Sequence, residues 1–159
     1  MIFVTVGSQM PFDRLLKAVD DWAEKQSPIP EIRAQHGGGG YKPKFMVGVE
    51  KLTPIEFERC CESSTLVIAH AGMGSILTAI TLGKPIVILP RRGDLKETRN
   101  DHQISTARWL SSRPGVFVAS TEAELGTCIE RGLTHAAVAR ESLDAPEPFI
   151  RALKQFIDK

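Results

Sequence analysis

The residues best suited to chemistry form a short motif in the middle of the chain, His70-Ala71-Gly72-Met73-Gly74-Ser75. An apolar run, Leu66 to Ala69, precedes the motif, and another, Ile86 to Leu89, follows it. This order predicts a βαβ unit whose turn is free to take a ligand. We expect the two glycines to adopt positive φ and the first amides of a helix from Ser75 to point unpaired into the same space. Such a turn suits a phosphate.

Three polar side chains near this turn are candidates for direct ligand contact. His70 ends the strand immediately before the glycines. A lone histidine is most often structural, but an imidazole beside phosphates donates to an oxygen and helps stabilise a departing diphosphate, so we predict a catalytic role for it. His102 and Gln103 open a later helix and are placed to bond hydroxyls. The alternative for that pair is an ordinary amphipathic helix start.

Composition limits the class of protein. A chain of 159 residues fits one domain, residues 1–159, so an activity that needs two α/β domains must borrow the second. With 20 Lys+Arg against 19 Asp+Glu, nothing favours nucleic acid. The start of the chain lacks leader features and no apolar run is long enough to span a membrane, which predicts a cytosolic protein. Three cysteines, two of them adjacent, form no disulfide framework and no spaced metal-binding pair.

Several familiar motifs do not occur in the sequence. There is no Gly-x-Gly-x-x-Gly fingerprint and no Gly-x-x-x-x-Gly-Lys-Ser/Thr run, which disfavours a dehydrogenase and a P-loop kinase. No Gly-x-Ser-x-Gly elbow points to a hydrolase. Asp-x-Asp is also missing, so any diphosphate chemistry is expected to use helix dipoles and backbone amides instead of Mg²⁺ or Mn²⁺, with no metal and no cofactor.

A parallel sheet with helices on both faces is expected to position the motif, because strands and helices alternate along the chain. Further strands are predicted at 2–6, 31–35, 45–49 and 116–119, and further helices after Pro11, from Thr53 to about Cys61, at about 102–111, from Thr121 to 131 and from about 148. Pro28 and Pro30 are predicted to end the first helix. Glutamates three residues after Thr53 and Thr121 predict capping boxes.

Three loops are expected to meet at the carboxyl edge of this sheet, where ligands bind in such folds. They are Gly7-Ser8-Gln9, His70 to Ser75, and Pro90 to Gln103. Two of them are glycine-and-serine turns that lead to helices, and two helix amino ends suit a diphosphate. Four glycines, Gly37 to Gly40, predict a surface hairpin or linker, with a mobile lid beside the site as the alternative.

Taken together, the motifs resemble glycosyltransferase family 28, C-terminal domain. The resemblance rests on residues 4–8, 11–15, 70–76, 83–85, 90–92 and 100–103, and its specific part is His-Ala-Gly-x-Gly-Ser followed by Gly-Lys-Pro. It is strongest to the small stand-alone subunits of two-part transferases in dolichol-linked oligosaccharide and bacterial exopolysaccharide synthesis. It implies a Rossmann-like half of a GT-B glycosyltransferase that holds a UDP-sugar.

The resemblance also implies roles for particular residues. The first loop and the Gly72 to Ser75 turn would contact phosphates, and the segment around Asn100 to Gln103 would lie near the sugar. Many relatives have a ribose-binding glutamate at the position of Thr78, whose shorter, uncharged hydroxyl bears on nucleotide affinity and choice. Arg91 and Arg92 would favour an acidic sugar, unless they are simply solvated. With His70 as catalytic residue, the predicted substrate-binding set is Gly7, Ser8, Gln9, Gly72, Met73, Gly74, Ser75, Thr78, Arg91, Asn100, Asp101, His102 and Gln103.

In the resembling family the acceptor and the general base belong to the other GT-B half. The resemblance therefore implies a heterodimer with a membrane-anchored partner that presents a lipid-linked acceptor. The predicted activity is an inverting, metal-independent hexosyl, N-acetylhexosaminyl or glucuronosyl transfer. The alternatives are a non-catalytic nucleotide-binding or scaffold module, which Thr78 favours, and a UDP-sugar epimerase, which the chain length disfavours. An apolar stripe in residues 149–157 would dock the partner or cover the chain's own core.

Overall fold

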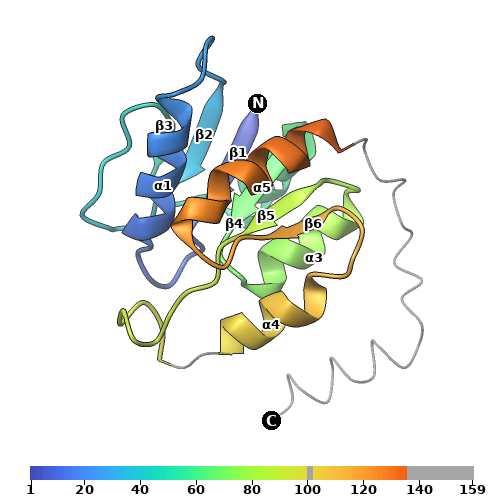
Figure 1. The fold of residues 1–159 in the computed structure, drawn as a ribbon. Coiled ribbons are helices and arrows are strands. Elements are labelled where there is room, and N and C mark those ends of the chain that lie inside the picture. Colours follow the sequence, from blue (N-terminus) through green and yellow to red (C-terminus); the bar gives the residue numbers. More distant parts are fainter. Residues whose placement is uncertain (100–101, 136–159) are drawn as a thin grey trace.

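The computed structural model describes residues 1–99 and 102–135, which form one six-stranded parallel sheet between two layers of helices (Figure 1). The strands are β1 (Ile2–Thr5), β2 (Ile32–Gln35), β3 (Val47–Val49), β4 (Leu66–Ala69), β5 (Ile86–Ile88) and β6 (Val116–Val118). The helices are α1 (Asp13–Ala23), α2 (Pro54–Ser63), α3 (Met73–Thr81), α4 (His102–Leu110) and α5 (Glu122–Thr134). The predicted Rossmann-like fold class is confirmed.

The order of the strands fixes where a ligand can bind. It runs β3-β2-β1-β4-β5-β6, so the chain moves outward from β1 in one direction and then returns to the other side of β1 with β4. Thr5 pairs with Ala69, and Ala69 with Ile88, so the loops after β1, β4 and β5 leave the sheet at the same edge. Parallel sheets of this kind bind ligands beside such a reversal.

Two apolar clusters, one on each face of the sheet, hold the layers together. Alternate residues of β1 point to opposite faces, with Val4 in one cluster and Phe3 in the other. On the Val4 face, α1 and α5 pack side by side and contribute Trp22 and Ile129. On the Phe3 face, α2, α3 and α4 contribute residues such as Ile76. Coverage of both faces explains why the strands are apolar throughout.

The helix starts follow the capping signals in the sequence, with one difference. At α2 the predicted capping box is present: Glu56 N donates to Thr53 Oγ1 at 3.3 Å, and Thr53 N donates to Glu56 Oε2 at 2.8 Å. At α5 the helix begins after Thr121 as expected, but the Thr121 side chain makes no capping bond. Glu124 instead accepts from Ser120 N at 2.9 Å.

Other element boundaries differ from expectation. Helix α1 ends at Ala23, well before Pro28, so the two prolines are not what ends it. Strand β3 starts at Val47 and not at Phe45, because Phe45 N donates to Asp20 Oδ1 at 3.0 Å instead of joining the sheet. The helix predicted from about residue 148 lies outside the described residues.

The glycine-rich segment 37–45 is fastened along α1. Asp13 Oδ2 accepts from Gly40 N and Tyr41 N, each at 3.1 Å. Asp20, which is buried, accepts from the Tyr41 hydroxyl at 2.9 Å and from Lys44 N at 2.7 Å. Burial and the Asp20 carboxylate raise the pKa of Tyr41 to about 12. These anchors favour the interpretation as a surface linker over the mobile lid.

Within the described part of the chain, no helix combines the length and the apolarity needed to cross a membrane.

Candidate functional site

A cavity of about 550 Å³ opens at the carboxyl edge of the sheet, beside the strand reversal between β1 and β4. Loops after β1, β4 and β5 supply most of its polar lining. The structure brings together ten of the predicted residues there: Gly7, Ser8, Gln9, His70, Gly72, Gly74, Ser75, Thr78, Arg91 and Gln103. Gly7 and Gln103, the two ends of the set, are 96 positions apart in the sequence and line the same cavity.

Four predicted residues are not part of this lining as the structure describes it. Met73 lies in the first turn of α3, half-buried, without lining the cavity. His102 starts α4 and is exposed, also outside the lining. Asn100 and Asp101 lie outside the described residues.

The sequence interpretation missed one wall of the cavity. Gln35 ends β2, and an apolar group follows β3, so the rule that ligands gather beyond strand carboxyl ends would have found both had it been applied to every strand. Val6 and Met10 extend the first loop, and Thr98 belongs to the loop after β5. The missed lining residues are Val6, Met10, Gln35, Leu52, Pro54, Phe57 and Thr98.

The amino end of α3 leaves its first amides uncapped. The helix starts at Met73, two residues earlier than predicted, with Gly72 as N-cap in an extended conformation and no side-chain capping bond. The expected positive φ at Gly72 and Gly74 is wrong: Gly72 has a φ of −86°, and the glycine with positive φ in this site is Gly7, at +82°. Uncapped amides and the helix dipole together favour an anion at this end.

Two glycines make room for the His70 ring. A Cβ on Gly7 would lie 2.7 Å from Cε1 of His70, and a Cβ on Gly72 would overlap Nε2. The imidazole therefore packs between the loops that follow β1 and β4. Gly74 is different, because a Cβ there would meet nothing within 4 Å and would project into open space.

His70 is neutral at physiological pH. Burial lowers its pKa to about 4, and the positive charge of Arg91 adds to the effect. Nδ1 is buried and has no hydrogen-bond partner among the described residues. A neutral imidazole carries a single N–H, so His70 brings no charge to the cavity and donates at most one hydrogen bond.

Arg91 provides the permanent positive charge of the lining, but its side chain is already engaged. Its guanidinium donates to four main-chain oxygens: Val6 O at 2.8 Å, Met10 O at 2.6 Å, Pro11 O at 2.6 Å and Glu97 O at 3.2 Å. Only 4% of the residue is exposed. The charge still favours an anion in the cavity, while the terminal N–H groups hold the protein's own backbone.

Two further polar contacts of the site involve Thr78 and Gln103. Thr78 Oγ1 donates to Gly74 O at 2.9 Å, within α3. Gln103 Oε1 accepts from Arg91 N at 3.1 Å, which ties the first turn of α4 to the loop after β5. The prediction of two converging helix amino ends is wrong, because α1 begins only at Asp13 and its first turn does not line the cavity.

Comparison with known proteins identifies the class. Over residues 1–148 the sequence matches the family described as glycosyltransferase family 28 C-terminal domain, and the chain belongs to that family. It is 28% identical over 159 residues to the UDP-N-acetylglucosamine transferase subunit ALG13 of Yarrowia lipolytica (strain CLIB 122 / E 150), covering 92% of this chain and 78% of that protein.

Solved structures show the same fold. The solution NMR structure of ALG13 is similar with a TM-score of 0.65 and 21% identity, over 99% of this chain and 96% of that one. The crystal structure of the kitacinnamycin glycotransferase gives a TM-score of 0.66 at 18% identity over 98% of this chain. Because this chain spans 42% of that larger protein, its fold corresponds to one half of a GT-B glycosyltransferase.

Proposed function

We propose that this chain is the donor-binding catalytic subunit of a UDP-sugar glycosyltransferase. The observation that carries the proposal is the uncapped amino end of α3, which opens into a cavity at the strand reversal. Membership of glycosyltransferase family 28 supports transferase chemistry. The likeness to a UDP-N-acetylglucosamine transferase subunit supports a UDP-sugar, with N-acetylglucosamine as the first sugar to test.

The reaction would be a single displacement with inversion. An acceptor hydroxyl attacks the anomeric carbon, the bond from that carbon to the diphosphate oxygen breaks, and UDP leaves. The α3 amides and the single N–H of neutral His70 would stabilise the charge that builds on the diphosphate. Ser75, buried in the first turn of α3, lines the same part of the cavity. None of these donors requires a metal ion.

The acceptor side would be supplied by a second subunit. The chain corresponds to the size of one GT-B half, and the similar Yarrowia protein is described as a transferase subunit. We propose a membrane-anchored partner that carries a lipid-linked acceptor and keeps this chain at the cytoplasmic membrane surface. The partner would also supply the general base.

Calorimetric titration of the full chain with UDP tests the first step. We expect saturable binding of UDP and a lower affinity for UMP, because UMP lacks the second phosphate. Lack of binding at millimolar UDP, in a sample whose NMR spectrum shows a folded protein, would contradict the proposal. Transfer from UDP-N-acetylglucosamine in the presence of the partner, and not in its absence, would test the two-subunit assignment.

A non-catalytic nucleotide-binding module is the second candidate, and Thr78 favours it. Its hydroxyl bonds to Gly74 O within α3, at the position where many relatives have a ribose-binding glutamate. UDP binding by the chain, combined with no sugar transfer by the assembled pair, would decide for this alternative.

A further inference from the structure

One buried arginine joins two of the loops that line the cavity. Arg91 follows β5, yet three of its four guanidinium bonds go to main-chain oxygens of the β1–α1 loop, those of Val6, Met10 and Pro11. The fourth goes to Glu97 O in its own loop. The guanidinium carbon also lies 4.6 Å from the centre of the Phe12 ring, so an aromatic face covers the cation.

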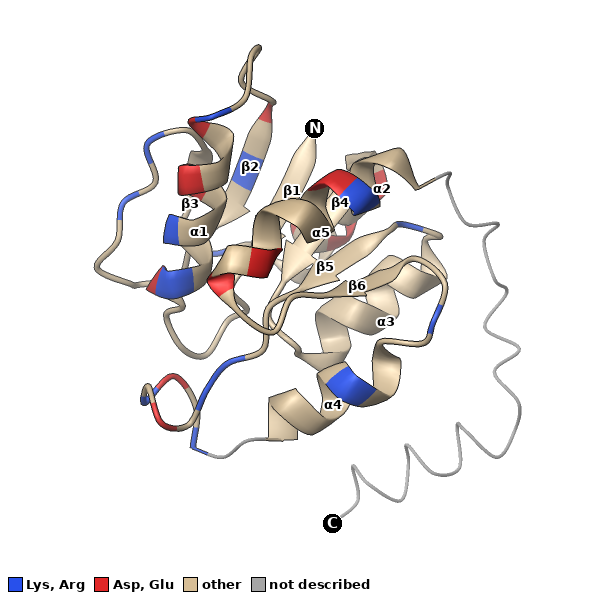
Figure 2. Cartoon of the chain, in the orientation of Figure 1, with Lys and Arg blue, Asp and Glu red and all other residues tan. Residues whose placement is uncertain are grey.

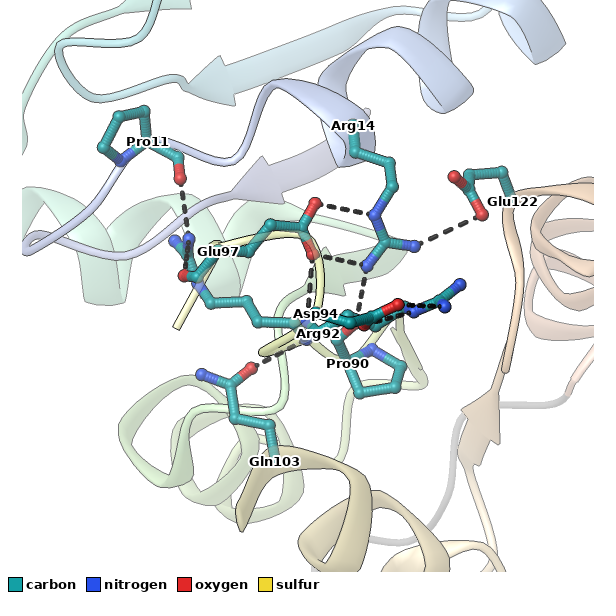
Figure 3. A network of polar contacts seen from close by, with 9 residues as sticks. Pro11, Arg14, Pro90, Arg92, Asp94, Glu97, Gln103 and Glu122 are labelled. Atoms are coloured by element: carbon teal, nitrogen blue, oxygen red, sulfur yellow. Dashed lines mark hydrogen bonds and ion pairs between the residues drawn. The ribbon is translucent and has the colours of Figure 1, made fainter. Parts of the chain in front are cut away.

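Further contacts, drawn in Figure 3, hold the loop after β5. Glu97 takes a forked pair of bonds from Arg14, Nε to Oε1 at 2.7 Å and Nη2 to Oε2 at 2.8 Å. Arg14 also donates to Pro90 O at 2.8 Å and lies 3.3 Å from the carboxylate of Glu122. The loop after β5 is thereby fixed against α1, and Arg14 itself is paired with Glu122 of α5.

We propose that Arg91 is a positioning residue of the donor site, whose guanidinium sets the β1–α1 loop relative to the loop after β5. This inference rests on the proposed function in so far as Gly7 to Gln9 meet the donor. It replaces the expectation that Arg91 binds the sugar. Both terminal nitrogens already donate to main-chain oxygens, of which the bond to Val6 O is buried, and exchanging one of these bonds for a ligand would leave a carbonyl without its partner.

The geometry requires an arginine. A lysine ammonium keeps the charge, but its donors radiate from one nitrogen and cannot span four carbonyls that surround a planar fork. Charge and geometry are therefore separable. Arg91→Lys preserves the positive charge and removes the planar arrangement of donors. A purely electrostatic role predicts that the lysine variant binds UDP like the wild type, whereas positioning predicts a loss.

The matched experiment compares Arg91→Lys with Arg92→Lys, the same change at the next residue. The Arg92 side chain is 40% exposed and pairs with Asp94, Nη2 to Oδ2 at 2.6 Å. We expect Arg91→Lys to weaken UDP binding at least about tenfold, since a loop displaced by about 1 Å costs as much or more, and Arg92→Lys to stay within about twofold. Backbone amide shifts in ¹⁵N NMR spectra should move at residues 7–10 only in the Arg91 variant.

The wild-type chain gives an independent readout that needs no ligand. A guanidinium held on four sides rotates slowly, so we expect resolved Nη–H signals from Arg91 and averaged ones from Arg92. Averaged signals from Arg91, or unchanged UDP affinity in Arg91→Lys, would overturn the positioning role. If wild-type protein bound no UDP while these NMR signals were present, the proposed function would fail, and with it the role of Arg91 in a donor site, while the anchoring of the β1–α1 loop by Arg91 would stand.

Discussion

Two loops at the same edge of the sheet use their polar groups in opposite ways. The turn between β4 and α3 has no charged residue, leaves its amides uncapped and faces open space at Gly74. The loop between β5 and α4 carries charges of both signs close together (Figure 2), and three of its charged residues make ion pairs, Arg92 with Asp94 and Glu97 with Arg14 of α1. The neutral loop is the one available to a ligand, and the charged loop is the one that supports it.

The physical reason lies in what each kind of group can satisfy by itself. A guanidinium presents five donors and can bond to several carbonyls of its own chain, as Arg91 does. The first amides of a helix have no partner within the helix, so they remain available unless a side chain caps them. In this protein no side chain caps α3.

The largest effect is expected from Gly74→Val, which places a side chain in the open space beside the uncapped amino end of α3. Its side chain would enter the space that a phosphate needs, so UDP affinity should fall at least about 100-fold by calorimetry. Gly38→Val is the matched control, because a Cβ at Gly38 also meets nothing within 4 Å but the residue does not line the cavity. Equal affinities in the two variants would remove the α3 turn from the site.

The next effect concerns His70 and pH. Its folded pKa of about 4 lies below the ordinary value of 6.5, so the unfolded chain binds more protons between these values. The stability contribution is present in full above pH 6.5 and is lost as pH falls toward 4, up to about 3 kcal/mol. Urea melts from pH 7 to 4 should show a flatter profile for His70→Asn. Parallel profiles would mean that His70 is not buried as a neutral ring.

Glu97→Gln tests the supporting contacts of the charged loop between β5 and α4. Losing the forked bond with Arg14, whose side chain is 11% exposed, should lower the free energy of unfolding by about 2 kcal/mol. Asp94→Asn makes the same chemical change in the exposed pair with Arg92 and should leave urea melts unaltered. A larger effect from Asp94 than from Glu97 would reverse the assignment of the supporting contacts.

The smallest effect is expected from Thr78→Glu. A carboxylate at this position would reach a ribose hydroxyl, and one charge-assisted hydrogen bond corresponds to a gain of about tenfold in UDP affinity. Comparing the UDP affinities of Thr78→Glu and Thr78→Ser by titration shows how strongly this position limits nucleotide binding. Weaker binding by the glutamate variant would indicate that the nucleoside does not lie along α3.

Local sequence patterns predicted the fold and the α3 turn because their causes are local. Apolar runs define β1, β4 and β5, and the pair Thr53 and Glu56 defines the start of α2. The role of Arg91 was not predictable in this way, since its partner Met10 lies 81 positions earlier. The same holds for Asp20, whose bonds to residues 41–45 displace the start of β3. The distant partners of these charged residues are not visible in the sequence.

The anchored glycine segment has a practical consequence. Gly37 N donates to Glu50 O at 3.0 Å, and Asp13 holds Gly40, so both sides of Gly38 are fixed while Gly38 itself is exposed. A fluorophore attached to a cysteine at position 38 would be held on a fixed segment of the backbone, away from the cavity. Its anisotropy would report the tumbling of the whole particle, and thus recruitment to vesicles or to another polypeptide, without disturbing the cavity.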